Sequence, residues 1–457
     1  LTFVPNFNEF LMNRQNLFLF VWMLMLAWLP VSAQEYRNPV IPGYHPDPSV
    51  CRVGDTFYLV NSSFQYFPGV PIFQSKDMVH WQQIGNVLDR ESQIPLKGAS
   101  SWLGIYAPTI RYHEGTYYMI TTNVGNGGNF IVTATDPRGP WSEPVWLKQQ
   151  GIDPSLYFEN GKCYMVSNPG DAIWLCEINP KTGEQLTESK QLWQGDGGRY
   201  PEGPHIYKKD GYYYLLISEG GTELAHRLTI ARSRNIEGPY ESNPNNPILT
   251  NCSRQGQSKQ IQGTGHGDLV QAGDGNWWMV FLAYRNYGGS YHHLGRETYL
   301  APVEWKEGEW PVVNGGMPID TLVKANTLPS VLLEKHLEAD AEDAPATGAF
   351  EWVQLQNPIP GNYLRNDTMA VEEKYFVRLY PHGTLTENQQ PTFVGRRQES
   401  ASFSLETDVV TKGEVEAGLS VYQINDGHLD FFVSQKQVAL RCKLKSIDYV
   451  VKSVPRL

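Results

Sequence analysis

The chain has 457 residues, a length typical of two or three domains, and an apolar content of 41% that is sufficient for packed cores. A formal net charge of −11 argues against a nucleic-acid or anionic-membrane surface. The aromatic content of 12% favours a β-rich fold, because aromatic rings pack well on pleated surfaces.

The N-terminal segment has the pattern of an export signal. A short positive start at residues 12–14 precedes an unbroken apolar run over residues 17–29, and residues 31–33 supply a small-residue cleavage motif. Thirteen apolar residues are too few for a membrane-spanning helix, which needs about 20. We therefore expect a signal peptide over residues 1–33, of which 12–33 is the genuine part. The mature protein is expected to be secreted, periplasmic or extracellular, without a membrane anchor.

An aromatic-rich strand core recurs five times in the first 300 residues. At intervals of 60, 46, 50 and 64 residues, its second member is Tyr58, Tyr118, Tyr164, Tyr214 and Trp278. Most copies follow a Gly turn and are flanked by short alternating runs, which indicates antiparallel strands. Five units of about four strands each predict a five-bladed β-propeller over residues 35–325. An open β-sandwich is less favoured because it gives no reason for five matched registers.

A second feature keeps register with the first. The residues that stand ten positions before the aromatic residue are Pro48, Pro108, Pro154, Pro204 and, in the fifth unit, Asp268. The first strand of a propeller blade lines the central channel, so equivalent positions converge on the axis. Close to these positions lie Asp47, Asp153, Glu202 and His266. The repeat alone therefore places three carboxylates and a histidine around one end, or mouth, of the central channel.

A single Asp in this pattern has an ordinary structural explanation, because Asp-Pro is a common start of a turn. Three carboxylates at matched positions are harder to explain in that way, since neighbouring negative charges repel, and perturbed carboxylates mark functional sites. His266 stands among Gly263, Gly265 and Gly267, which let the backbone approach another group closely. A substrate or a bound cation fits that description. We therefore expect a functional site at this end of the channel.

These stretches resemble glycoside hydrolase family 43, the β-xylosidase and α-L-arabinofuranosidase type. The resemblance covers about residues 36–325, and its motifs are specific in combination although each alone is weak. The matching segments are residues 38–49, 64–70, 107–111, 153–155, 201–204, 219–222 and 295–298. The resemblance implies a five-bladed propeller that hydrolyses glycosidic bonds with inversion of configuration.

The resemblance also implies a role for each carboxylate. Asp47 is the general base that activates water, Glu202 is the general acid that protonates the leaving oxygen, and Asp153 raises the pKa of the acid and orients it. A nearby anion does keep an acid protonated, and an inverting pair must leave room for a water. Residues implied to bind the terminal sugar are Phe64, Tyr106, Thr222, His266 and Arg296. Tyr106 stands where the family often has Trp, which leaves the choice between xylose and arabinofuranose open.

The expected function is an inverting exo-acting β-1,4-xylosidase that releases terminal xylose from fragments of xylan or arabinoxylan. The alternatives are an α-L-arabinofuranosidase, an enzyme with both activities and, from another class, a non-catalytic sugar-binding propeller. The presence of all three carboxylates disfavours the last. No cofactor is expected to be required and no metal ligand is assigned, although some relatives hold a structural Ca²⁺ on the axis near the position of His266. The oligomeric state stays open.

The repeat ends near residue 325, and an acidic stretch predicts a linker over residues 326–346. Strand patterns that resemble the concanavalin A-like β-sandwich of one branch of the family then follow at residues 402–406, 417–423 and 429–433. The family's sandwich is usually longer. We therefore expect residues 347–457 to form a short or truncated sandwich with an exposed sheet edge.

The five cysteines show no CxxC or Cys/His metal spacing. Cys163 and Cys176 flank a turn symmetrically and face each other if the two segments pair as a hairpin. A disulfide between them is therefore a candidate feature of the third repeat.

Overall fold

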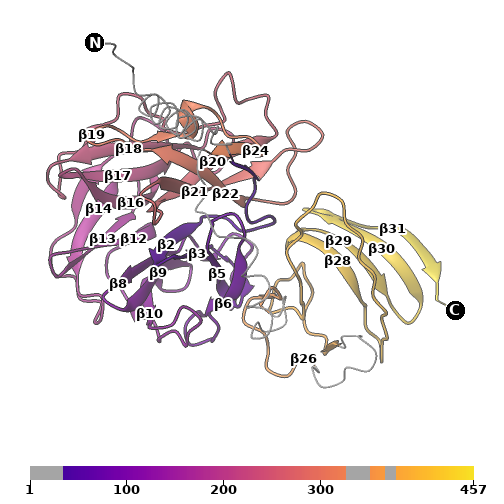
Figure 1. Ribbon diagram of the computed structural model, residues 1–457. Coiled ribbons are helices and arrows are strands. Elements are labelled where there is room, and N and C mark those ends of the chain that lie inside the picture. Colours follow the sequence, from indigo (N-terminus) through magenta and orange to yellow (C-terminus); the bar gives the residue numbers. More distant parts are fainter. Residues whose placement is uncertain (1–33, 326–349, 366–376, 457) are drawn as a thin grey trace, which may run out of the picture.

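The computed structural model describes residues 34–325, 350–365 and 377–456, which form an all-β chain. Figure 1 shows two parts: a ring of sheets coloured from indigo to orange, and a separate sheet in yellow near the C-terminus. The expected signal peptide and the whole expected linker lie outside the described residues. Within the described ranges, no helix is long and apolar enough to cross a membrane.

The ring contains five antiparallel sheets, here called blades. Blade one contains β2 (Ser49–Val53), β3 (Thr56–Val60), β5 (Gly69–Ser75) and β6 (Gln82–Leu88). Blade two contains β7 (Gly104–Ile105), β8 (Thr109–His113), β9 (Thr116–Val124), β10 (Gly128–Ala134) and β11 (Val145–Trp146). Blade three contains β12 (Ile152–Glu159), β13 (Lys162–Asn168), β14 (Ile173–Ile178) and β15 (Lys190–Trp193).

Blade four contains β16 (Glu202–Lys209), β17 (Tyr212–Glu219), β18 (Arg227–Ser233) and β19 (Glu241–Ser242). Blade five contains β20 (Ile261–Gln271), β21 (Trp277–Arg285), β22 (Glu297–Glu304) and β23 (Val312–Val313), followed by a 3₁₀ turn, η1 (Asn314–Gly316). Around the centre, β2 contacts β8, β8 contacts β12, β12 contacts β16, β16 contacts β20, and β20 contacts β2. The ring is therefore closed by its innermost strands, and the prediction of a five-bladed propeller is confirmed.

The repeat register arises from the turn of each inner hairpin. In blade three the turn is Asn160-Gly161, with φ of 51° and 74°, and such left-handed pairs form the tight turns that match strand twist. The inner hairpin of blade four has a turn of the same type, and there Tyr214 pairs with Tyr207, seven residues earlier. The turn of blade five is one residue longer, so Trp278 pairs with Val270, eight residues earlier.

This longer turn corrects one sequence assignment. Counted from the strand pairing, Gly267 rather than Asp268 takes the place of the repeated proline in blade five. His266 is then equivalent to Asp47, and Asp268 is equivalent to Ser49, the residue after the proline. The sequence count was wrong because it assumed hairpin turns of equal length.

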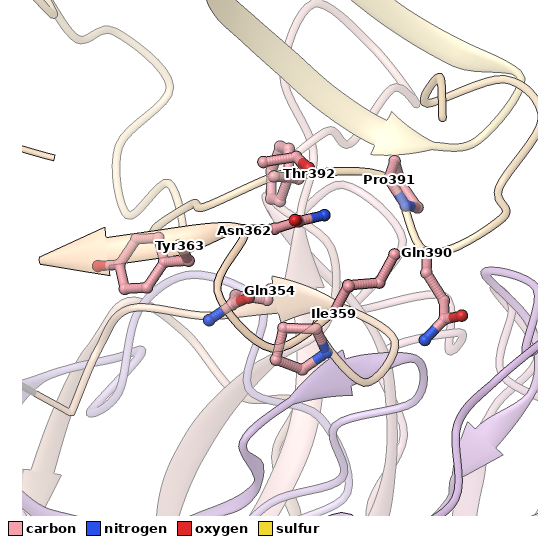
Figure 2. Close-up of a pocket in the computed structure, with 9 residues that line it drawn as sticks. Gln354, Ile359, Asn362, Tyr363, Gln390, Pro391 and Thr392 are labelled. Atoms are coloured by element: carbon pink, nitrogen blue, oxygen red, sulfur yellow. The ribbon is translucent and has the colours of Figure 1, made fainter. Parts of the chain in front are cut away.

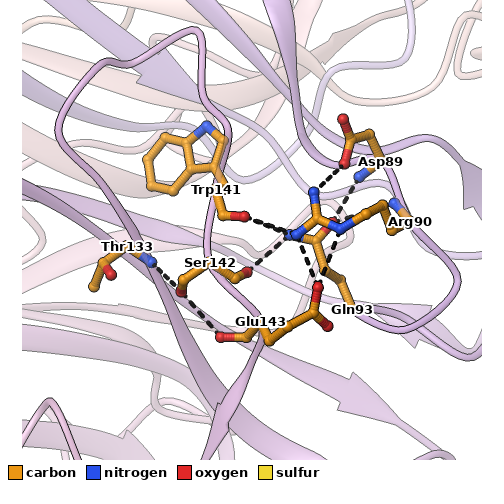
Figure 3. A network of polar contacts seen from close by, with 7 residues as sticks. All are labelled: Asp89, Arg90, Gln93, Thr133, Trp141, Ser142 and Glu143. Carbon is orange, nitrogen blue, oxygen red and sulfur yellow. Dashed lines mark hydrogen bonds and ion pairs between the residues drawn. The ribbon is translucent and has the colours of Figure 1, made fainter.

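Contacts between blades combine apolar packing with side-chain hydrogen bonds. The largest core cluster includes the fully buried rings of Trp278, Tyr214 and Tyr299, and each such ring contributes about 1.5–3 kcal/mol on burial. Between blades one and two, Arg90 donates to the main-chain oxygen of Trp141 at 2.7 Å and to Glu143 at 3.0 Å (Figure 3). These bonds fasten the end of blade one to the outer part of blade two.

The two ends of the propeller meet in one small sheet. β1 (Gln34–Arg37) pairs antiparallel with β24 (Leu322–Ala325). In addition, the hydroxyl of Tyr36 in β1 and the side-chain amide of Asn38 both donate to the main-chain oxygen of Leu300 in blade five, at 2.8 and 2.9 Å. The first residues of the propeller are thereby fixed to its last blade.

The C-terminal part begins on the propeller itself. β25 (Gln354–Leu355) pairs with β4 (Tyr66–Phe67), a short strand of the propeller's first repeat, and β26 (Tyr363–Arg365) pairs with β27 (Val377–Leu379). A small pocket lies between β25, the start of β26 and residues 390–393 (Figure 2). Its lining contains no carboxylate and no histidine, so it does not offer acid–base chemistry.

The last four strands form one sheet: β28 (Ala417–Ile424), β29 (Gly427–Val433), β30 (Gln437–Leu444) and β31 (Ile447–Pro455). The strands predicted at residues 417–423 and 429–433 are confirmed. The strand predicted at residues 402–406 is wrong, because Phe403 and Leu405 are exposed there and no strand pairs with them in the described chain. One face of the sheet buries Phe432, whereas Phe431 on the other face is 56% exposed. The four-stranded sheet therefore has one face on which apolar side chains are exposed, and the short form of the sandwich stays a prediction.

All five cysteines lie within the described residues and are free thiols. In the hairpin of β13 and β14, Cys163 pairs with Ile178 and Cys176 pairs with Met165. The two cysteines are therefore offset by two residues rather than opposite each other, and the candidate disulfide is not formed.

Candidate active site

The predicted site lies near the start of the innermost strands of blades one, three and four and within β20 of blade five. Asp47, Asp153 and His266 hold the equivalent position in blades one, three and five, with φ of 54°, 53° and 47°. Gly203 has φ of 60° at this position in blade four, and Glu202 directly precedes it. Left-handed non-glycine residues cost about 1–3 kcal/mol each and cluster at functional sites. In blades three, four and five the strand register also shifts here, as in β-bulges that redirect side chains.

Asp47 is 4% exposed and has partners on both carboxylate oxygens. Ser62 donates to Oδ2 at 2.5 Å, and the guanidinium of Arg296 donates to Oδ1 at 3.0 Å. The Nδ1 atom of His266 lies 3.8 Å from Oδ1. Burial alone raises the pKa of Asp47, but Arg296, His266 and Ser62 together hold the pKa below its usual value. Asp47 is therefore ionised at neutral pH.

Asp153 is in the opposite electrostatic situation. It is 6% exposed and accepts a hydrogen bond from the main-chain N–H of Gly203. Burial and the negative charges of Glu202 and Asp47 raise the pKa of Asp153 well above its usual value. Arg296 opposes this shift without reversing it. Burial and these neighbouring charges therefore favour the protonated form of Asp153.

Glu202 has a neighbour that the repeat pattern does not reveal. Nε2 of the buried His226 lies 3.4 Å from Oε1 of Glu202. His226 belongs to the loop between β17 and β18, outside the matched positions, so no spacing signal marks it. A Cβ on Gly265 would lie 2.2 Å from the His226 ring, so glycine at that position makes room for the ring.

The glycines around His266 have the same explanation. A Cβ on Gly263 would lie 2.1 Å from the ring of Tyr284, and one on Gly267 would lie 2.8 Å from Leu228. A Cβ on Gly203 would lie 3.0 Å from the ring of His266 itself. The groups that the backbone approaches closely are neighbouring side chains. Packing against these side chains is sufficient to explain the glycines, and the expectation of a substrate or cation beside them stays a prediction.

Phe64, Tyr106 and Arg296 form one wall beside the carboxylates. The guanidinium of Arg296 lies 5.5 Å from the centre of the Phe64 ring, which is 5.2 Å from the Tyr106 ring. Burial, with a contribution from Asp153, raises the pKa of Tyr106, whose hydroxyl donates to the main-chain oxygen of Trp102 at 2.7 Å. The structure thus brings three of the predicted sugar-binding residues together with the carboxylates.

Thr222 is the predicted residue that stands apart. It is exposed on the loop between β17 and β18, and no hydrogen bond joins it to the carboxylates among the described residues. The preceding Glu219 is fully buried and accepts hydrogen bonds from the main-chain N–H groups of Asp196 and Gly198, at 2.9 and 2.7 Å. Glu219 therefore fixes the backbone of residues 196–198, which lie shortly before Glu202 in the chain.

The surroundings of His266 do not form a cage for Ca²⁺. This ion takes about six to eight oxygen ligands, whereas both oxygens of the adjacent Asp47 are bound to Ser62 and Arg296. Across the described ranges, no group of three or more His, Cys, Asp or Glu side chains is arranged to hold a metal ion. Burial lowers the pKa of His266, so its ring is neutral at neutral pH.

Two residues beyond His266 along β20 lies a further acidic residue, Asp268, whose two carboxylate oxygens both accept hydrogen bonds. Its Oδ2 accepts from Ser49 at 2.7 Å and Arg111 at 2.8 Å, and its Oδ1 accepts from Tyr207 at 2.6 Å. Burial raises the pKa of Asp268, but Arg111 and the neighbouring His205 outweigh it and hold the pKa far below its usual value. This layer joins blades one, two, four and five.

The arrangement at the mouth can perform general acid–base chemistry. An ionised carboxylate, Asp47, can accept a proton, and the raised pKa of Asp153 favours a protonated carboxyl group close to Glu202. Groups that need opposite protonation states at one pH are separated by their environments in this way in acid–base enzymes. The aromatic wall offers apolar surface to a ring-shaped ligand, and Arg296 offers donors to its hydroxyl groups.

Comparison with known proteins places this geometry in a family. Residues 36–311 match the profile of glycosyl hydrolases family 43, and residues 344–454 match the β-xylosidase C-terminal concanavalin A-like domain. The chain is 40% identical to the non-reducing end alpha-L-arabinofuranosidase BoGH43B of Bacteroides ovatus over 461 residues, 97% of this chain and 85% of that protein. It is 44% identical to a xylosidase/arabinosidase of Butyrivibrio fibrisolvens over 430 residues, 89% of this chain and 81% of that protein.

A solved structure agrees with these matches. The xylan beta-1,4-xylosidase from Bacillus halodurans C-125 resembles this fold with a TM-score of 0.80 at 33% identity, over 92% of this chain and 85% of that chain. The predicted sandwich class of the C-terminal domain is confirmed by the matched domain. This protein is therefore a glycoside hydrolase: the chain belongs to glycosyl hydrolases family 43, with a C-terminal concanavalin A-like domain after the propeller.

Proposed function

We propose that this enzyme releases terminal xylose from β-1,4-linked xylo-oligosaccharides with inversion, using Asp47 as general base and Glu202 as general acid. One observation carries the proposal: at the channel mouth, Asp47, whose pKa is held below its usual value, lies together with Glu202 and with Asp153, whose pKa is raised. An inverting hydrolase needs this combination, because one carboxylate activates water and another carboxyl group protonates the leaving oxygen.

The positions of the two groups support inversion over retention. Asp47 precedes the first strand of blade one, and Glu202 begins the first strand of blade four. Blades one and four are not neighbours in a ring of five, which favours a wide separation. Inverting carboxyl pairs are about 6.5–9.5 Å apart so that a water fits, whereas retaining pairs are about 5–5.5 Å apart.

An α-L-arabinofuranosidase activity is the second candidate. Two of the relatives described above carry arabinofuranosidase or arabinosidase in their names, and Tyr106 replaces a frequent Trp in the pocket wall. A smaller ring at this position changes the shape offered to the sugar. Enzymes with both activities would use the same carboxylates, so the two candidates differ in the pocket and share the mechanism.

Product analysis tests both points. Xylobiose, a nitrophenyl β-xyloside and a nitrophenyl α-arabinofuranoside are compared side by side, and we expect the largest kcat/KM on a β-xyloside. Proton NMR of the first-formed product from that β-xyloside should show α-xylose before mutarotation. First-formed β-xylose would mean retention, and Asp47 would then have to be reassigned as a nucleophile.

A further inference from the structure

The chain that follows the propeller reaches the back of the pocket wall. Nε of Arg397 donates to the main-chain oxygen of Tyr44 at 2.7 Å, and its guanidinium lies 6.0 Å from the centre of the Tyr66 ring. Gly43 permits this approach, since its φ is 81° and a Cβ there would lie 2.9 Å from the main-chain oxygen of Gln398. The backbone near Gly43 therefore lies close to the backbone near Gln398, and the side chain of Arg397 joins the two segments.

Tyr44 connects this contact to the catalytic groups. Its ring centre lies 5.9 Å from that of Phe64, and its hydroxyl shares a hydrogen bond with Arg296. Arg296 in turn donates to Asp47. A Cβ on Gly295 would lie 2.5 Å from the Tyr44 ring, so the ring occupies the space beside Arg296 fully. A displacement of Tyr44 would therefore move Phe64, which belongs to the aromatic wall, and Arg296, which binds the proposed base Asp47.

Further bonds hold the same two regions together. Glu297 accepts from the main-chain N–H of Gly43 at 2.9 Å and from Nε of Arg285 at 2.7 Å, and Arg285 donates to the main-chain oxygen of Glu399 at 3.1 Å. The amide of Gln65 donates to the hydroxyl of Tyr422 in β28 at 3.1 Å. The C-terminal part therefore contacts residues on both sides of Tyr44 and Phe64.

Arg397 differs from the adjacent Arg396 in its burial and in its partners. In the part of the chain that the structure describes, Arg397 has no carboxylate partner, and burial lowers its pKa. The exposed Arg396 instead pairs with Glu351 and lies over the Trp352 ring at 5.6 Å. Holding an arginine partly buried beside two tyrosines costs desolvation energy, which a specific function for the contact would explain.

We propose that Arg397 is a positioning residue that holds Tyr44 against Arg296, so that the C-terminal part of the chain sets the geometry of the sugar pocket. The inference rests on the proposed role of Asp47 as base. Arg397 touches neither the substrate nor Asp47; it acts through Tyr44.

Four variants test this inference: Arg397→Ala, Arg397→Lys, Tyr44→Phe and, as matched control, Arg396→Ala. Arg397→Ala should raise KM between roughly 10-fold and 100-fold, because misplacement of positioning groups by about 1 Å has effects of this size. It should also move the acid limb of the kcat/KM profile to higher pH, since Arg296 then holds Asp47 less firmly. Arg397→Lys should recover part of both effects, and Arg396→Ala should keep wild-type values.

Tyr44→Phe distinguishes the contact between Arg397 and Tyr44 from the contact between Tyr44 and Arg296. It keeps the main-chain oxygen that Arg397 binds and removes the hydroxyl that meets Arg296, so it should shift the acid limb without weakening the contact between the two parts. The double variant with Arg397→Ala should add little, as coupled residues are not additive. If Arg397→Ala only lowers the melting temperature and leaves KM and the acid limb unchanged, the inference is wrong.

An Asp47→Glu variant tells this failure apart from failure of the proposed function. If the acid limb belongs to residue 47, this change of carboxyl group moves it. A limb that stays in place would overturn the assignment of the base, whatever the result for Arg397.

Discussion

Two layers of the same channel use buried aspartates in opposite ways. At the mouth, Asp153 faces two other carboxylates, and burial together with their charge raises its pKa. Two residues beyond His266, Asp268 accepts hydrogen bonds from Arg111, Tyr207 and Ser49. Burial raises its pKa, but Arg111, His205 and Tyr207 outweigh burial and hold the pKa far below the usual value. The comparison teaches that burial of a carboxylate does not by itself indicate function. Asp153, whose pKa is raised, lies among the candidate catalytic groups, whereas Asp268 is paired on both oxygens and joins the blades.

The largest expected effect is on catalysis at the mouth. Asp47→Asn should lower kcat by about 10²–10⁴-fold on natural xylosides and on activated aryl xylosides alike, because water still needs a base. Glu202→Gln should damage the natural substrate as severely but spare a substrate with a good leaving group, which needs little protonation. Steady-state kinetics on xylobiose and a dinitrophenyl xyloside measure both. Equal losses on both substrates in Glu202→Gln would argue against the acid role.

The next largest effect is on stability in the deeper layer. Asp268→Asn leaves the guanidinium of Arg111 buried without its counter-charge, so we expect a loss of about 3–5 kcal/mol in the free energy of unfolding. Urea denaturation measures this. Asp274→Asn, on the exposed turn of the same hairpin, serves as control and should change stability by less than about 0.5 kcal/mol. A stable but inactive Asp268→Asn protein would place this residue with the catalytic groups instead.

The smallest effect, with opposite sign, concerns Asp153. Its pKa is raised in the folded state, so the folded protein binds more protons than the unfolded chain between the unfolded and the folded pKa, and stability falls as pH rises through that window. Asp153→Asn removes this loss and should raise the melting temperature by roughly 2–4 °C at pH 7, as expected for about 1 kcal/mol. Activity should fall at the same time.

The pH dependence of that gain is the check on its cause. The difference between Asp153→Asn and wild type should shrink as the pH falls through about 4, the ordinary pKa of Asp in an unfolded chain, because the wild-type carboxyl group is protonated in both states only below that value. Differential scanning calorimetry over this range measures it, with Asp171→Asn on an exposed turn of blade three as control. A gain that is the same at all pH values would show that repulsion among the carboxylates is not its source.

The sequence by itself determined the repeat, the five blades and the convergence of Asp47, Asp153, Glu202 and His266 on one mouth. These follow from local rules: hairpin turns fix the distance between paired strands, and the first strand of every blade faces the axis. The family resemblance added Phe64, Tyr106 and Arg296, which the structure places beside the carboxylates, and Thr222, which stays exposed.

Only the tertiary structure decided the rest. Three neighbours of the site stand outside the positions that the repeat marks. Only the folded chain brings His226 to Glu202, Tyr44 to Arg296, and Ser62 to Asp47. The alignment of blade five depended on one extra residue in a turn, and the glycines near His266 depended on rings that come from distant strands. The charge state of each carboxylate belongs to this group as well. Burial and neighbouring charges determine a pKa, and both are properties of the folded chain rather than of any residue type.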